Sequence, residues 1–237
     1  MNRTLGEVIT GIVTDKHDDT VYVQKNGITY ELDEETSYSL GDAVEGFVYQ
    51  NKNGQNKMTQ TIPAASKEQY GWGSVQYVRR DLGVFVDIGL PDKDLVVSLD
   101  ILPGEKSVWP KKGDRLYIRI EQDAEGRLWG VPAEEEMFFD KQVPGSKEEH
   151  NQPIEGTVFR AKLSGTLFVT EENKIGFIHP SEREAEPRLG QSITGRVVGL
   201  REDGVLYASL LPRAHEALDE DAAMILEVLK KIGRAHV

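Results

Sequence analysis

The sequence predicts an all-β protein made of three small five-stranded barrels in tandem. Four landmarks recur in the same order along the 237 residues: a Gly-x-Val, a strand that ends in a β-branched residue, a Gly that opens a further strand, and a Gly turn. The period of roughly 70 to 80 residues exceeds the ~20–50 residues of a solenoid repeat and suits a domain that folds by itself. Five strands are too few for a sandwich and fit a closed barrel of the OB type.

The strands can be placed in chain order in each unit. The first strand begins at Gly6-Glu7-Val8, Gly73-Ser74-Val75 and Gly156-Thr157-Val158. The second strand follows as TVYV (20–23), LGVFV (82–86) and GTLFV (165–169). A later strand lies in LGDAVEGFVY (40–49), KGDRLYIRI (112–120) and LGQSITGRVV (189–198). These segments are rich in β-branched and aromatic residues and are bounded by Gly, Asn, Asp and Pro, as is typical of strands joined by turns.

Turn dipeptides and internal glycines support barrel closure. Asn26-Gly27, Asn53-Gly54 and Asp203-Gly204 accept the positive φ angles of tight hairpins. Gly83 and Gly165 lie inside strands, where they would permit the sharp coiling that a closed barrel needs.

Polar segments rich in Pro and Gly mark the domain boundaries. PAASKEQYGWG (63–73) follows the first unit, and residues 134–153 follow the second, with a helical turn expected at Glu134–Glu136. We expect domains at 1–66, 67–140 and 151–213. In 214–237, apolar residues at helical spacing predict an amphipathic helix that opens a further domain. The tail IGRAHV matches the translation of a sequencing-library adapter and is read as an artefact, with a natural tail as the alternative.

Composition indicates a soluble, cytoplasmic protein. The chain has no cysteine, which excludes disulfides and thiolate metal sites and fits a reducing compartment. Its start lacks the apolar run of a signal peptide, and no stretch approaches the ~18 apolar residues of a membrane span. We therefore expect no membrane contact.

Charge is distributed unevenly among the units. The net charge of −12 weighs against a polyanionic partner. Residues 1–66 carry 5 basic and 10 acidic side chains, and residues 67–140 carry 10 and 15. Residues 151–213 carry 8 of each, so the third unit could present a basic face.

The third unit carries the sharpest motif. Its GTLFV strand is followed by IGFIHPSE (175–182) and later by GLREDGVLYASL (199–210). This order resembles the S1 RNA-binding domain, in which a Gly-x-Phe-Val strand precedes Gly-hydrophobic-hydrophobic-His-x-Ser. The resemblance extends moderately to the second unit through LGVFVDIG (82–89) and LVVSLD (95–100). The first unit keeps only the skeleton of glycines and strands.

The whole arrangement resembles the conserved virulence factor B family of Gram-positive bacteria. That family carries tandem S1-type domains and a C-terminal winged helix, and it is linked to RNA binding and control of gene expression. The resemblance implies three S1-like OB-fold barrels here, followed at 214–237 by the start of a truncated winged-helix domain.

OB barrels bind single strands on the face of their second and third strands, where bases stack on aromatic rings and cations contact phosphates. On this basis the predicted RNA-binding residues of the third unit are Phe168, Phe177, His179, Arg160, Lys162, Lys174 and Arg196. In the second unit Phe85 is placed where Phe168 stands, and Arg127 matches a basic position of the family's binding face. Each phenylalanine has a competing interpretation as a core residue, whereas the Pro-Ser after His179 favours a surface position. Trp72, Trp109 and Trp129 are interpreted as packing residues.

The chain shows no enzyme motif. It has no phosphate-binding glycine loop, and its five histidines share no metal-ligand spacing. The sequence therefore predicts a non-enzymatic, single-stranded RNA-binding regulator of gene expression without cofactor or metal. The alternative is a protein-interaction scaffold that contacts the ribosome or the transcription machinery and binds nucleic acid weakly or not at all.

Overall fold

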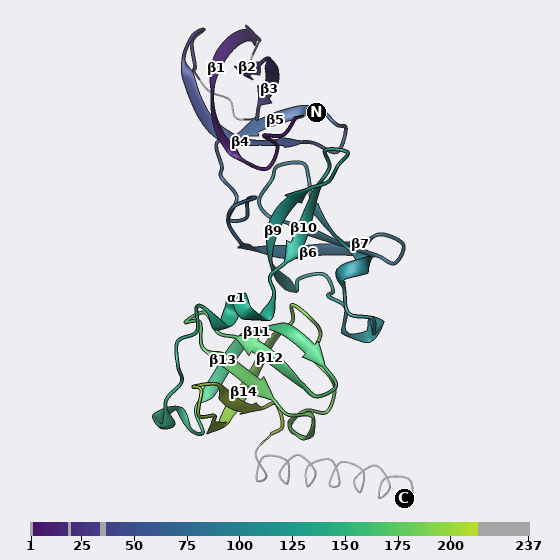
Figure 1. Ribbon diagram of the computed structural model, residues 1–237, viewed down its shortest axis with the longest axis vertical. Coiled ribbons are helices and arrows are strands. Elements are labelled where there is room, and N and C mark those ends of the chain that lie inside the picture. Colours follow the sequence, from purple (N-terminus) through teal and green to yellow (C-terminus); the bar gives the residue numbers. More distant parts are fainter. Residues whose placement is uncertain (1, 19, 34–36, 213–237) are drawn as a thin grey trace, which may run out of the picture.

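The computed structural model describes residues 2–18, 20–33 and 37–212. In these ranges fifteen strands form three five-stranded sheets, each closed into a barrel, which follow one another from the N-terminus downward in Figure 1. The predicted all-β class and the five strands per unit are confirmed. The predicted C-terminal helix and tail at 214–237 lie outside the described residues.

All three barrels share one strand order in which the fifth strand pairs with the third and the fourth. Barrel 1 contains β1 (Val8–His17), β2 (Thr20–Lys25), β3 (Ile28–Leu32), β4 (Ala43–Gln50) and β5 (Asn56–Thr59). Barrel 2 contains β6 (Gly71–Arg79), β7 (Gly83–Asp87), β8 (Leu95–Ser98), β9 (Arg115–Gln122) and β10 (Leu128–Pro132). Barrel 3 contains β11 (Pro153–Lys162), β12 (Gly165–Val169), β13 (Ile175–Ile178), β14 (Ser192–Leu200) and β15 (Leu206–Ser209).

The first strand of every barrel carries a β-bulge at the same place. The pairing with the second strand shifts between Val13 and Asp15, between Val75 and Tyr77, and between Val158 and Arg160. A bulge adds one residue to one strand and so changes which side chains face outward beyond it. Val75 is therefore buried, while Tyr77, two residues later, is 47% exposed.

Two equivalent glycines fix the register of the second strands. Gly83 has a φ of 139° and pairs with Arg79, and Gly165 has a φ of 141° and pairs with Lys162. Counting from these glycines, Phe85 matches Leu167, and Phe168 matches Val86. The predicted equivalence of Phe85 and Phe168 is wrong by one residue, and such a step moves a strand side chain to the opposite face of the sheet.

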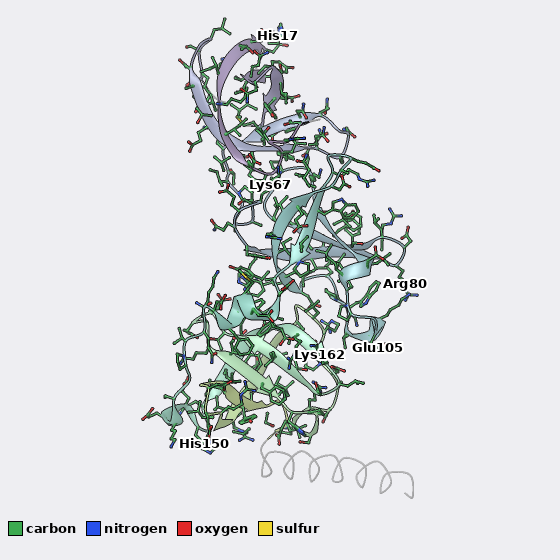
Figure 2. The ribbon with its side chains drawn as sticks, in the orientation of Figure 1. His17, Lys67, Arg80, Glu105, His150 and Lys162 are labelled. Atoms are coloured by element: carbon green, nitrogen blue, oxygen red, sulfur yellow. The ribbon has the colours of Figure 1, made fainter. Side chains whose placement is uncertain are left out.

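The first two barrels share one continuous apolar core that includes Leu5, Phe47, Leu95 and Ile120. Lys67, in the predicted linker, fastens the junction: its ammonium group lies 3.0 Å from Glu7 Oε1 and donates to the carbonyl of Arg3 at 2.6 Å. Figure 2 shows Lys67 where the two barrels meet.

The second and third barrels are joined by polar contacts and by an aromatic cluster, in which Phe138 of the linker contacts Trp72 and Tyr117 of barrel 2 and Phe159 of barrel 3. Arg188 donates two hydrogen bonds to the Asp114 carboxylate, at 2.9 and 3.0 Å. The backbone N–H of Leu189 donates to the carbonyl of Val108, and that of Arg115 donates to the carbonyl of Gly190. Helix α1 (Glu135–Phe139), within the predicted second linker, lies over barrel 3 on the side that faces barrel 2 (Figure 1). The expected helical turn at this linker is thus confirmed.

Candidate nucleic-acid interface

A row of large side chains crosses the outer surface of barrel 2. The strand register places Tyr77 opposite Phe85, Phe85 opposite Val96, and Val96 opposite Trp129. The Tyr77 and Phe85 rings are stacked, with centroids 4.2 Å apart and planes 16° from parallel. We call Tyr77, Phe85, Val96 and Trp129 the barrel 2 platform. A flat, partly exposed aromatic surface of this kind is what nucleobases stack on.

Asp123 orders one end of the barrel 2 platform. Its Oδ2 accepts a hydrogen bond from Trp129 Nε1 at 2.9 Å and another from Arg127 Nε at 2.7 Å. These hydrogen bonds hold the pKa of the Asp123 carboxyl well below its usual range, and the bond from Trp129 has the largest effect. The Arg127 guanidinium lies 5.6 Å from the centroid of the Trp129 ring, in a cation–π position. Arg127, a predicted binding residue, therefore sits at the edge of the same surface as Phe85.

The opposite end of the barrel 2 platform carries two further arginines. Arg79 ends β6 and forms an ion pair with Asp81 at 2.6 Å. Arg80 is exposed in the turn that follows and projects from the edge of the molecule in Figure 2. Among the described residues no ion pair involves Arg80, so its charge is available to a phosphate.

The corresponding surface of barrel 3 is largely covered. Phe168 is fully buried in the core, so the expectation that it stacks on a base does not fit its position. Leu167, which takes the place of Phe85, is only 2% exposed because Phe138 of helix α1 packs in the same apolar cluster. Phe138 also stacks on Phe159, with centroids 4.1 Å apart. The linker thus lies where the predicted RNA-binding face was expected.

The predicted cations of barrel 3 are paired with glutamates of the same linker. Glu135 binds Arg160 at 2.6 Å and Lys162 at 3.1 Å. Glu149 binds Lys174 at 2.5 Å. Each carboxylate offsets charge that a phosphate would otherwise meet. Arg196, on β14, is half-buried, and its guanidinium lies 3.5 Å from the side-chain oxygen of Asn151.

Three side chains keep part of the barrel 3 surface accessible. Phe177 is half-buried and contacts Tyr207 edge to face, with centroids 6.0 Å apart. Tyr207 is 37% exposed. His179 is exposed, as expected, and its Nδ1 accepts a hydrogen bond from the backbone N–H of Ser181 at the start of a 3₁₀ turn. These residues form a smaller and less flat surface than the barrel 2 platform.

Barrel 1 carries charge at the equivalent positions. Its outer row runs through Asp15, Tyr22, Glu31 and Lys57. Lys57 is held by Glu31 at 2.7 Å and by Asp33 at 3.3 Å, so its charge is neutralised within the barrel. Tyr30, a further aromatic residue of this unit, is buried in the core. One tyrosine between two carboxylates is a poor surface for a polyanion.

Comparison with known proteins decides the family. An S1 domain model matches residues 5–61, the model of the CvfB first S1-like domain matches residues 70–131, and the model of the second domain of virulence regulatory factor CvfB matches residues 138–212. YitL of Bacillus subtilis (strain 168) is 38% identical over 213 residues, which are 90% of this chain and 69% of YitL. The chain belongs to the conserved virulence factor B family. The expectation from the sequence motifs is confirmed.

Further relatives place the chain within the virulence factor B family. Conserved virulence factor B of Staphylococcus aureus (strain MRSA252) is 34% identical over 200 residues, which are 84% of this chain and 66% of that protein. The chain thus spans about two thirds of the length of this relative. A crystal structure from Streptococcus pneumoniae, described as a multidomain protein with nucleic acid binding domains, superposes with a TM-score of 0.87 at 49% identity. The superposition covers 98% of this chain and 82% of the Streptococcus pneumoniae chain.

Tyr77, Val96 and Trp129 are the platform residues that the sequence analysis did not predict. Strict alternation from Val75 points Tyr77 inward, and only the bulge turns it outward. Trp129 was interpreted as a packing residue, yet it is half-buried on the outer row, beside Arg127. A sequence signal exists in two of the three units, where the last strand carries an aromatic residue: Trp129 in barrel 2 and Tyr207 in barrel 3.

Within residues 2–18, 20–33 and 37–212, none of the helices is long and apolar enough to cross a membrane. Within the same ranges, histidine, aspartate and glutamate side chains do not gather in threes as a metal site would require.

Proposed function

We propose that this protein binds single-stranded RNA through the barrel 2 platform and acts, without catalysis, in the regulation of gene expression in the cytoplasm. The observation that carries the proposal is the stacked pair Tyr77–Phe85, continued across the sheet by Val96 and Trp129. Aromatic stacking is tolerant of sequence because every base has a π face, and it is worth about 1–3 kcal/mol per base.

Electrostatics supports the same location. Arg80 and Arg127 stand at opposite ends of the barrel 2 platform, where the phosphates of an extended strand would pass. Arg127 is paired with Asp123 and Glu125, so among the described residues of this surface Arg80 is the better phosphate contact. Barrel 2 is acidic overall, so attraction over long range is weak. We therefore expect modest affinity, dominated by stacking, with only a few phosphate contacts. The choice of RNA rests on the S1 and virulence factor B models that match the chain.

Fluorescence anisotropy with a labelled, unstructured RNA tests the proposal. The logarithm of the binding constant should fall with the logarithm of salt concentration by about 0.7 for each phosphate contacted. We expect a shallow slope that corresponds to about two or three contacts. A DNA oligonucleotide of the same base sequence tests the preference for RNA. Failure to bind any single strand at low salt would refute the proposal.

The alternative function is a protein-interaction scaffold for the ribosome or the transcription machinery. One observation favours a protein-binding role in addition to RNA binding at the barrel 2 platform. An apolar groove with an acidic rim lies between barrels 2 and 3.

A further inference from the structure

The groove between barrels 2 and 3 has a volume of about 1020 Å³. Its inner wall is apolar and includes Val108, Pro132 and Phe159. Two apolar side chains stand at its rim with large exposed fractions, Ile101 at 49% and Leu163 at 86%. Leu163 lies at the tip of the turn between β11 and β12, where such exposure contributes little to folding. Exposed apolar residues beside a concave apolar surface are typical of a binding site, because they contribute little to the packing of the folded chain.

The groove is formed before any partner arrives. Its walls belong to different barrels, and the Asp114–Arg188 ion pair fixes these barrels to each other beside it. The Leu189 N–H donates to the Val108 carbonyl at 2.9 Å, which ties the two walls directly, since both residues line the groove. A preformed site lowers the entropy cost of binding.

The charge around the groove argues against a nucleic acid. Three glutamates, Glu105, Glu134 and Glu186, line it. Glu186 is paired with Arg183 at 3.5 Å, so Glu105 and Glu134 supply most of the negative charge. The two cations in its lining, Arg160 and Lys162, are both bound to Glu135. Phosphates would meet net negative charge here, whereas lysine or arginine side chains would be attracted. Figure 2 labels Glu105 on barrel 2 and Lys162 on barrel 3, and both residues line the groove.

Two features of the groove together define its partner. Its apolar wall and the exposed side chains of Ile101 and Leu163 fit apolar residues, and the carboxylates of Glu105 and Glu134 attract lysine or arginine. In an extended segment successive side chains point to opposite faces, so alternating apolar and basic residues present both features at once.

We propose that the groove binds an extended segment of a partner protein in which apolar side chains alternate with lysine or arginine. The apolar side chains enter between Ile101 and Leu163, and the basic side chains face Glu105 and Glu134. This site is separate from the barrel 2 platform, and the inference does not depend on RNA binding.

The test uses the full chain and a fluorescein-labelled peptide of alternating leucine and lysine. We expect saturable binding that weakens about tenfold or more in the double variant Ile101→Ser/Leu163→Ser, which removes the apolar contacts without changing the charge. Leu40→Ser is the matched control, because Leu40 is an exposed apolar residue of barrel 1, at 69%, and should leave binding unchanged. Peptides of serine–lysine and leucine–glutamate should bind at least about tenfold more weakly, because each lacks one of the two required features.

Three results would overturn the inference. The first is no binding of the leucine–lysine peptide by the parent chain, and the second is equal binding of that peptide by the double variant and the parent. The third is a loss of RNA affinity in the double variant as large as in Tyr77→Ala, because the groove would then belong to the RNA-binding surface. Unchanged RNA affinity with lost peptide binding supports the inference, whatever becomes of the proposed RNA function.

Discussion

The ring of Phe168 occupies the space in which a side chain at Gly176 would stand: an added Cβ at Gly176 would lie 2.0 Å from the ring. The two residues face each other directly in the β12–β13 pairing. Gly176 is therefore the residue that admits Phe168 to the core of barrel 3, and the pair is a packing unit that no base can reach.

Phe168→Ala should destabilise barrel 3 by about 3–5 kcal/mol, the usual cost of removing a buried phenylalanine. Gly176→Ala should also destabilise it, because the ring has no room to retreat in a close-packed interior. Chemical denaturation monitored by circular dichroism measures both. Normal stability of Phe168→Ala together with weaker RNA binding would contradict this assignment and restore Phe168 as a stacking residue.

Tyr77→Ala and Trp129→Ala should each weaken RNA binding by about 1–3 kcal/mol, the cost of one lost stacking partner. Tyr77 is 47% exposed, so its variant should melt almost as the parent does. Trp129→Ala also removes the hydrogen bond from Trp129 Nε1 to Asp123, so its melting temperature should fall and is measured beside its affinity. Tyr22→Ala is the matched control, since Tyr22 holds the equivalent place of Phe85 on barrel 1 between acidic neighbours. An equal loss of affinity in the control would show that the barrel 2 platform is not the preferred surface.

His179→Ala should lower RNA affinity less than Tyr77→Ala does. His179 is exposed, but the linker covers the adjoining surface of barrel 3 and neutralises its cations. The variant should lose about 0.5–1.5 kcal/mol of stability, because the hydrogen bond from the Ser181 N–H to the imidazole is removed. Anisotropy paired with thermal melting separates the two effects. A larger loss of affinity in His179→Ala than in Tyr77→Ala would make barrel 3 the principal site.

The Asp123 carboxyl should make stability depend on pH in acid. Hydrogen bonds from Trp129 and Arg127 lower its pKa in the folded protein. A carboxyl with a lowered folded pKa contributes stability above its unfolded pKa of about 3.9, and this contribution is lost as the pH falls toward the folded value. The stability difference between the parent and Asp123→Asn should thus be present at neutral pH and shrink below about pH 4. A difference that stays constant across this range would show that Asp123 is not selectively stabilised in its charged form.

Arg188→Ala should destabilise the junction of barrels 2 and 3. It would leave the Asp114 carboxylate, whose side chain is 7% exposed, without its bidentate partner. Removing one partner of a buried pair costs about 3–5 kcal/mol, and we expect the lower end because Arg188 itself remains 24% exposed. Denaturation measures the stability, and small-angle scattering measures the spacing of the barrels. Unchanged values in both would show that the backbone hydrogen bonds and the aromatic cluster around Phe138 hold the junction without this ion pair.

The strands of each barrel could be predicted from local signals. β-Branched runs, turn dipeptides such as Asn26-Gly27 and the repeated glycines each report on a few neighbouring residues, and the backbone obeys them: Asn26 and Gly27 both adopt positive φ. The family could be predicted as well, because its motif consists of short segments that can each be recognised locally: GTLFV (165–169), IGFIHPSE (175–182) and GLREDGVLYASL (199–210). Phe85 and Arg127 follow from the same resemblance, and their part in binding stays a prediction.

Which face each aromatic residue takes was decided by tertiary structure. A bulge adds one residue to β6 and brings Tyr77 outward. From the sequence, Phe85 and Phe168 were placed at equivalent positions with the same stacking role, but the strand register puts them one residue apart and on opposite faces. The linker that covers barrel 3 could not be foreseen either, since Glu135 meets Arg160 across 25 residues of chain. Side-chain direction alternates with every residue, so one inserted position reverses it. Pairing across such separations depends on the closed barrels, and no local pattern in the sequence records it.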